Sequence, residues 1–129
     1  MPITNKRENG KQARKNGYKA ENIAALFLRL KGYKILERNF KPPRGTGAGE
    51  IDIIAYKHNV IIFFEVKLRS SLSSAAEAVD ERVQARRIRG AEYFLATRPE
   101  LADKEMRFDV ILIAPNRFPE HIQNAFTCS

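Results

Sequence analysis

Residues Gly49–Arg69 read GEIDIIAYKHNVIIFFEVKLR, two apolar runs separated by the dipeptide His58–Asn59. Runs rich in isoleucine, valine and phenylalanine predict two buried strands, and a two-residue connection predicts an antiparallel hairpin. Asp52, Glu65 and Lys67 lie inside these strands. Burying an unpaired charge there would cost a large part of the stability of a small domain. These three charged residues therefore need a structural or functional reason.

The expected turn fixes which charged residues of the hairpin lie opposite one another. It places Asp52 opposite Glu65, and it places Glu50 opposite Lys67. Side chains two residues apart on a strand share a face, so the four groups would form one cluster. A three-residue loop would break this pairing, and a slip of one residue would put Asp52 and Glu65 on opposite faces.

Two opposed carboxylates suggest a cation between them. Directly opposed residues lie about 5 Å apart at Cβ, and like charges in that position destabilise a sheet unless something neutralises them. Carboxylate oxygens of Asp52 and Glu65 suit magnesium or manganese, and Lys67 would orient a metal-bound water or stabilise charge on a phosphate. The alternative is a pair of edge ion pairs, Glu50 with Lys67 and Asp52 with an arginine, which would contribute little. The apolar surroundings of Glu65 favour a central strand and hence the metal site.

Length and composition predict one globular domain. The chain has 129 residues, of which 43% are hydrophobic. No apolar run reaches the ~18 residues of a membrane helix, and the N-terminus has no hydrophobic signal segment. The one cysteine, Cys128, cannot form an internal disulfide, which fits a cytoplasmic location.

The charge balance favours a polyanionic partner. The net charge is +8, and residues 1–19 contribute six basic residues and one acidic residue, or +5 of that total. We expect residues 1–16 to form a basic flexible tail and residues 17–129 to form the domain. Nucleic acid is the usual partner of such a chain, whereas a tail that only improves solubility is the alternative.

The remaining pattern predicts helices on a mixed sheet. Apolar residues at Ala20, Ile23, Ala24, Phe27 and Leu28 predict a first helix, which Gly32 would end. We expect further elements as a strand over 33–40, the two hairpin strands, a helix over about 76–97, a strand over 106–114 and a weaker strand over 119–127. This order is typical of an α/β fold with helices packed on a mixed sheet.

Asp52 followed after twelve residues by Glu65-Val66-Lys67, on adjacent strands after a first helix, resembles the PD-(D/E)xK nuclease motif. That motif marks the restriction-endonuclease-like superfamily, which includes archaeal Holliday-junction resolvases. The chain from Gly17 onward also resembles the small bacterial YraN family of uncharacterised proteins, in the segments AENIAALFLRLKGYKILERNF, GEIDIIA, FFEVKLR, RFDVILI and HIQNAF. The resemblance implies the restriction-endonuclease-like fold, a mixed central β-sheet flanked by helices.

The resemblance also implies roles for individual residues. Asp52 and Glu65 match the metal-binding carboxylates, Lys67 matches the motif lysine, and Glu21 matches an extra acidic residue of the resolvase-like branch. The motif proline is absent, because Ile51 precedes Asp52. The implied activity is magnesium- or manganese-dependent hydrolysis of phosphodiester bonds, in structured or branched DNA rather than RNA. For Glu21, a solvated glutamate at a helix start is the alternative.

Other polar residues of the second helix are candidates for the same site. Gln84 lies on its expected inward face, where superfamily members place a polar group near the metal; a boundary glutamine is the alternative. Arginines of this helix would contact phosphates, or would form a solvated face paired with acidic neighbours. The nucleic-acid-binding candidates are Arg82, Arg86 and Arg87 on the helix, Arg44 in the glycine-rich loop KPPRGTGAG, and Arg69 after the hairpin.

Three further residues receive structural interpretations. We expect His58 and His121 to be solvated, and Asp109 to be a buried acid paired with an arginine rather than a metal ligand.

Two other function classes stay open. The protein could be a non-catalytic nucleic-acid-binding or adaptor module that retains the nuclease fold, or a partner in protein interactions alone. Dependence on metal separates the first from a nuclease. Resolvases act as dimers, so a homodimer would favour that branch, but the sequence identifies no surface for it.

Overall fold

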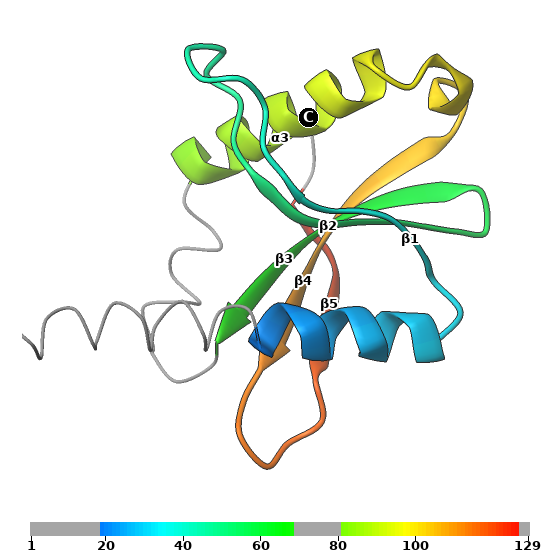
Figure 1. Cartoon of the computed structure of the whole chain (residues 1–129), viewed down its shortest axis with the longest axis vertical. Helices are drawn as coiled ribbons and strands as arrows, with labels where there is room; N and C mark the ends of the chain where they lie inside the picture. The colour runs from blue at the N-terminus through cyan, green and yellow to red at the C-terminus, as the bar shows by residue number, and fades with distance from the viewer. Residues whose placement is uncertain (1–18, 69–80, 127–129) are drawn as a thin grey trace, which may run out of the picture.

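The computed structural model describes residues 19–68 and 81–126 (Figure 1). The expected tail over residues 1–16, Arg69 and the beginning of the helix expected from residue 76 lie outside the described residues.

A five-stranded mixed sheet forms the centre of the molecule (Figure 1). The strand order follows the sequence, and only β3 and β4 run parallel. A parallel pair needs a long crossover connection, which contains α3 (Glu81–Ala96) and the short η1 (Pro99–Leu101). The strands are β1 (Lys34–Phe40), β2 (Ile51–Lys57), β3 (Val60–Leu68), β4 (Glu105–Ile113) and β5 (Glu120–Phe126). The expected α/β class and the order of elements are confirmed.

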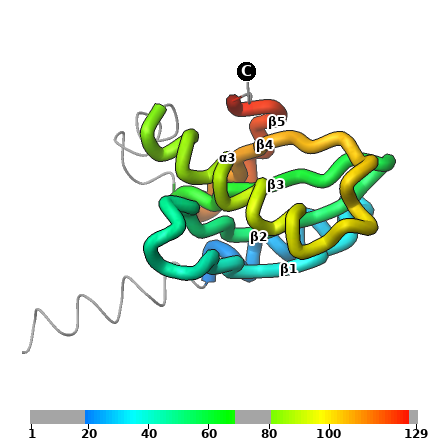
Figure 2. The backbone as a smooth tube through the Cα atoms, turned by 90° about the horizontal axis from the view of Figure 1, so that it is seen from above, coloured from blue at the N-terminus to red at the C-terminus, as the bar shows by residue number. Residues whose placement is uncertain are grey.

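The first helix, residues 19–30, and α3 lie on opposite faces of the sheet (Figure 2). The first helix buries Ala20, Ala24 and Leu28, which lie on one face at helical spacing. It ends where the sequence predicts. Gly32 has φ of 89°, its N–H bonds the Arg29 carbonyl at 3.0 Å, and the next N–H bonds the Leu28 carbonyl at 2.9 Å. These two bonds form the Schellman motif, whose left-handed position favours glycine.

The hairpin has the predicted register. His58 and Asn59 have φ of 51° and 66°, and two consecutive left-handed residues form the tight turn that matches strand twist. The pairing runs from Lys57 opposite Val60 to Ile53 opposite Phe64. Asp52 and Glu65 stand one step beyond this last pair, as predicted.

The apolar core has two layers, one on each side of the sheet. Ile53, Ile62 and Phe64 pack against the first helix, whereas Ile54 and Phe63 pack against α3. Because side chains two residues apart share a face, Asp52, Glu65 and Lys67 must point to the α3 side. The core therefore determines which helix completes the site.

In the described part of the chain, neither helix is both long enough and apolar enough to span a membrane.

Candidate active site

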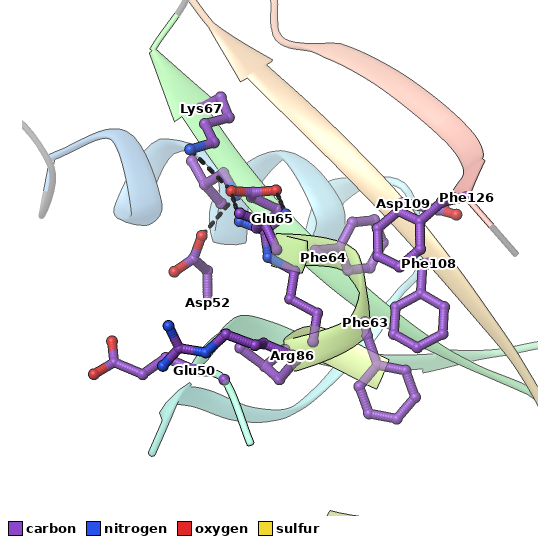
Figure 3. A pocket seen from close by; sticks show the side chains of 15 residues that line it. Glu50, Asp52, Phe63, Phe64, Glu65, Lys67, Arg86, Phe108, Asp109 and Phe126 are labelled. Carbon is purple, nitrogen blue, oxygen red and sulfur yellow. Dashed lines mark hydrogen bonds and ion pairs between the residues drawn. The ribbon is translucent and has the colours of Figure 1, made fainter. Parts of the chain in front are cut away.

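A cavity of about 410 Å³ lies between α3 and the ends of β2 and β3 (Figure 3). Its apolar wall includes Phe63, Phe108 and Phe126. Its charged wall comes from the hairpin, α3 and β4, and consists of Glu50, Asp52, Glu65, Lys67, Arg86, Arg87 and Asp109. The structure thus brings five of the ten predicted site residues to one place, namely Asp52, Glu65, Lys67, Arg86 and Arg87.

A close contact between two glycines positions α3 over this cavity. The Gly49 N–H donates to the Arg86 carbonyl at 2.7 Å, and a Cβ on Gly90 would lie 2.3 Å from the Gly49 oxygen. Arg89 Nη1 adds a bond to the Gly47 carbonyl at 3.3 Å. The loop before β2 therefore lies directly on the helix, and this contact sets the spacing between Asp52 and Arg87. The exposed Arg44, predicted to bind phosphate from this loop, does not line the cavity.

Glu65 is buried and is neutralised by two cations. Its side chain is 6% exposed, and Lys67 Nζ lies 3.0 Å from Oε1. The guanidinium of Arg87 contacts both carboxylate oxygens through its two terminal nitrogens. The contact of Nη2 with Oε1 is a hydrogen bond, and that of Nη1 with Oε2 is an ion pair. Charge-assisted contacts of this kind are among the stronger polar interactions in proteins. Lys67 thus pairs with its neighbour on the same strand face, whereas the edge-pair alternative had matched it with Glu50.

Asp52 accepts a hydrogen bond from β3, and its pKa is raised. The Val66 N–H donates to its Oδ2 at 2.8 Å. Burial raises the pKa of Asp52 to about 6; the nearby carboxylates of Glu21 and Glu65 add to the rise, against the Val66 hydrogen bond and the charge of Arg87. The raised pKa follows mainly from burial, so Asp52 holds its proton more tightly than a carboxyl group in water does.

Glu21 lies on the first helix, outside the cavity lining, and its carboxylate interacts electrostatically with Asp52. Burial raises the pKa of its carboxyl; Glu50 adds to this rise, whereas Arg38 and a hydrogen bond with Asn39 oppose it. One carboxylate oxygen, Oε1, is buried and has no hydrogen-bond partner among residues 19–68 and 81–126. The resemblance matches Glu21 to an extra acidic residue of the resolvase-like branch, and the structure places it within electrostatic reach of Asp52.

The site offers only a small set of oxygen donors for a divalent metal. Within the described ranges, no three His, Cys, Asp or Glu side chains cluster closely enough to hold a metal ion. Asp52 and Glu65 nevertheless line one cavity with hard oxygen donors, and the unpartnered Glu21 oxygen adds to the negative charge. Magnesium often takes only one or two protein carboxylates and completes its shell with water and substrate phosphates. Asp52 and Glu65 would be the residues that hold it.

The other predicted residues of α3 divide into two groups. Arg86 and Arg87 line the cavity, whereas Gln84 is half-buried outside its lining and Arg82 is exposed. Sequence reasoning assigned Arg87 to phosphate and missed its contact with Glu65. The sequence indicates that a buried Glu65 needs a cation as partner. It does not indicate which of the four arginines on the helix is that partner.

Asp109 also lines the cavity and is the centre of a second buried charge cluster. Asp109 accepts bonds from Arg107 Nε and Nη2 at 2.8 and 2.9 Å and from the Asn124 N–H at 2.8 Å, and His121 Nε2 lies 2.7 Å away. Burial would raise the pKa of Asp109, but the hydrogen bonds from His121, Arg107 and Asn124 outweigh burial and lower it. The predicted buried acid with an arginine partner is confirmed.

The expectation for the two histidines is half right. His58 is exposed in the turn. The prediction that His121 is solvated is wrong, because its side chain is 4% exposed and its ring packs against Tyr33 and Phe64. Pairing of β5 with β4 places His121 opposite Ile111 and beside Asp109, which gives its ring a polar partner inside the fold.

Fold and site together define a small α/β protein with a cavity lined by carboxylates and arginines. Residues 20–113 match the model of the Uncharacterised protein family UPF0102, and the chain belongs to this family. This is the YraN-like family that the sequence resembles.

Many relatives share nearly the whole chain. A UPF0102 protein of Paramagnetospirillum magneticum is 47% identical over 114 residues, which is 88% of each chain. UPF0102 proteins of Rhodopseudomonas palustris and Bradyrhizobium diazoefficiens are 48% and 47% identical, over 88% and 89% of this chain and 85% and 84% of theirs. The names of these relatives state the family and no activity.

Proposed function

We propose that this protein is a metal-dependent nuclease of the restriction-endonuclease-like superfamily, similar to archaeal Holliday-junction resolvases. Its reaction would be hydrolysis of phosphodiester bonds, with structured or branched DNA as the preferred substrate. The observation that carries the proposal is the placement of Asp52 and Glu65 on one face of the central hairpin, in one cavity with Lys67. A five-stranded mixed sheet with one helix on each face supports the proposed fold.

Each residue of the site has a distinct chemical task in this proposal. Asp52 and Glu65 would hold magnesium or manganese, which supplies a polarised phosphate and an activated water when bound. The ammonium of Lys67 lies 3.0 Å from Glu65 and places positive charge where a phosphate oxygen becomes more negative. The buried Oε1 of Glu21 offers an acceptor for a water proton beside Asp52.

Arginines at the cavity supply affinity for the DNA backbone. Arg86 lines the cavity and is exposed, and the net charge of +8 attracts a polyanion. Phosphate contacts of this kind position DNA without selecting sequence, which suits recognition of a branched shape. A cytoplasmic location and a homodimer, the state in which resolvases act, belong to the same proposal.

The competing function is a non-catalytic nucleic-acid-binding module that keeps the fold. The observation that favours it is the neutralisation of Glu65, since both of its oxygens contact Arg87. A self-neutralised cluster needs no metal. This module would bind DNA in a salt-dependent way, and its DNA affinity would not change when Asp52 is replaced.

A cleavage assay separates the two functions. Labelled four-way junction, flap, duplex, single-stranded DNA and RNA would be incubated with magnesium, manganese or chelator. Wild type would be compared with Asp52→Asn, and with Asp103→Asn, whose side chain is 80% exposed and lies outside the cavity lining. Metal-dependent cleavage in wild type and Asp103→Asn, but not in Asp52→Asn, supports the nuclease. Binding without cleavage, unchanged in Asp52→Asn, supports the module.

A further inference from the structure

Arg87 occupies both oxygens that a metal would need. Its two terminal nitrogens contact Oε1 and Oε2 of Glu65, and the pair is largely buried, with side chains 16% and 6% exposed. A divalent cation at Glu65 has to bind at least one of these oxygens. Guanidinium and metal therefore compete for the same two acceptors.

The charge balance of the site depends on this one side chain. Arg87 lowers the electrostatic cost of Asp52 and pairs directly with Glu65. Lys67 also contacts Glu65, at 3.0 Å from Oε1, and Lys67 would stay there if Arg87 left. Loss of Arg87 alone leaves Asp52, Glu65 and Glu21 with a deficit of positive charge that a divalent cation can fill.

We infer that the Arg87 guanidinium is a built-in counter-ion of Glu65 that must leave at least one of its carboxylate oxygens before a divalent metal binds there. The inference rests on the proposed function, because it takes the Asp52–Glu65 pair as the metal ligands. It adds regulation to that site, since in the protein without metal the charge of Glu65 is neutralised by Arg87.

The displaced guanidinium would have an anionic partner in a substrate. Arg87 and Arg86 line the same cavity, and arginine binds phosphate through two parallel hydrogen bonds. A DNA phosphate at the cavity would therefore stabilise the displaced form and raise metal affinity. By linkage, metal would raise DNA affinity by the same factor.

Manganese binding tests the inference without a cleavage readout. Full-length protein would be titrated with Mn²⁺ at pH 7.5, and unbound Mn²⁺ would be counted by electron paramagnetic resonance. We expect Arg87→Ala to bind Mn²⁺ at least about tenfold more tightly than wild type, because it removes a charge-assisted competitor. Arg87→Gln keeps a neutral hydrogen-bond donor for buried Glu65, so it protects the fold and should also bind more tightly.

The matched control is Arg98→Ala, which removes an arginine from an exposed ion pair with Glu100 outside the cavity lining. It changes net charge by the same amount and should bind Mn²⁺ like wild type. Circular dichroism of each variant checks that it is folded.

The possible outcomes separate this inference from the proposed function. Tighter binding in both Arg87 variants, including the case in which wild type binds no Mn²⁺, supports the counter-ion. Unchanged or weaker binding in folded Arg87 variants overturns it, while the metal site stands if Asp52→Asn abolishes wild-type binding. Absence of binding in every variant overturns both the counter-ion and the proposed metal site.

Discussion

The backbone N–H of Val66 donates a 2.8 Å hydrogen bond to Oδ2 of Asp52 and continues the β2–β3 hairpin through a side chain. The last residues paired through the backbone register are Ile53 and Phe64, so this bond joins the strands one step further on. It holds a carboxylate in a buried place beside Glu65. The same contact thus links the register of the hairpin to the chemistry of the cavity.

The first prediction is that Asp52 makes stability fall as pH rises. Its pKa is raised from 3.8 to about 6, so the folded state binds the proton more tightly than the unfolded state. Stability is greatest below the unfolded pKa and is lost between pH 3.8 and about 6. At 1.36 kcal/mol per unit, the loss is about 3 kcal/mol. Asp52→Asn keeps an acceptor for Val66 and lacks this loss.

Urea unfolding in chelator at pH 4, 5, 6 and 7 measures this difference. The stability of Asp52→Asn relative to wild type should increase by about 2.4 kcal/mol across the series, because part of the loss in wild type is already present at pH 4. Asp103→Asn, which alters an exposed carboxylate, is the control and should follow wild type. If the free energy of unfolding of wild type and of Asp52→Asn changed equally with pH, the pKa of Asp52 would not be raised by burial.

A second prediction concerns the contact between Gly49 and Gly90. Replacing glycine with alanine in a helix interior normally stabilises it by about 1 kcal/mol. At Gly90 the new Cβ would lie 2.3 Å from the Gly49 oxygen, so the loop or the helix must move. We expect Gly90→Ala to destabilise the protein by about 1–3 kcal/mol in urea unfolding. Exposed Glu92→Ala on the same helix is the control, and a stabilised Gly90→Ala would contradict the close contact.

The contribution of Asp109 to stability should change with pH in the direction opposite to that of Asp52. Its pKa is lowered in the fold, so its contribution is present above the unfolded value of 3.8 and is lost as pH falls through the folded value. Asp109→Ala removes the shared acceptor of Arg107, His121 and the Asn124 N–H. We expect a loss of about 3 kcal/mol or more at pH 7, measured by urea unfolding. A loss similar to that of Asp103→Ala, about 0.5 kcal/mol or less, would contradict a structural role for Asp109.

Arg86 tests the proposed DNA contact apart from catalysis. Arg86→Ala should weaken binding of a labelled four-way junction in chelator and lower the slope of log K against log salt by about 1. Fluorescence anisotropy across a salt series measures both quantities. Arg98→Ala, which removes a positive charge outside the cavity lining, should keep the wild-type slope. An equal loss of DNA affinity and of salt slope in Arg86→Ala and Arg98→Ala would mean that net charge alone, and not a contact of Arg86, determines DNA binding.

The hairpin could be predicted because local chemistry determines it. Two residues between apolar strands allow one turn geometry, and the turn sets the register that brings Asp52 beside Glu65. Gly32 ended the first helix for an equally local reason. The mixed sheet followed from the order of these elements.

Contacts between distant segments could not be predicted in the same way. Which arginine of α3 meets Glu65 depends on the rotation of the helix over the sheet, and the Gly49–Gly90 contact sets that rotation. The burial of His121 depends on the pairing of β5, whose sequence pattern was weak. In both cases the residue that determines the contact lies far away in the sequence, and residue spacing predicts only contacts between neighbours within a helix, a strand or a hairpin.

The central claim is that Asp52 and Lys67 serve a metal-dependent cleavage of nucleic acid. Its most direct test is single-turnover cleavage of a labelled four-way junction with magnesium, by wild type, Asp52→Asn and Lys67→Ala purified in parallel with Asp103→Asn. We predict cleavage by wild type and Asp103→Asn that chelator abolishes, and a loss of at least about 100-fold in the other two variants. Cleavage at the wild-type rate by folded Asp52→Asn, or no cleavage by any of the four proteins, would contradict the account.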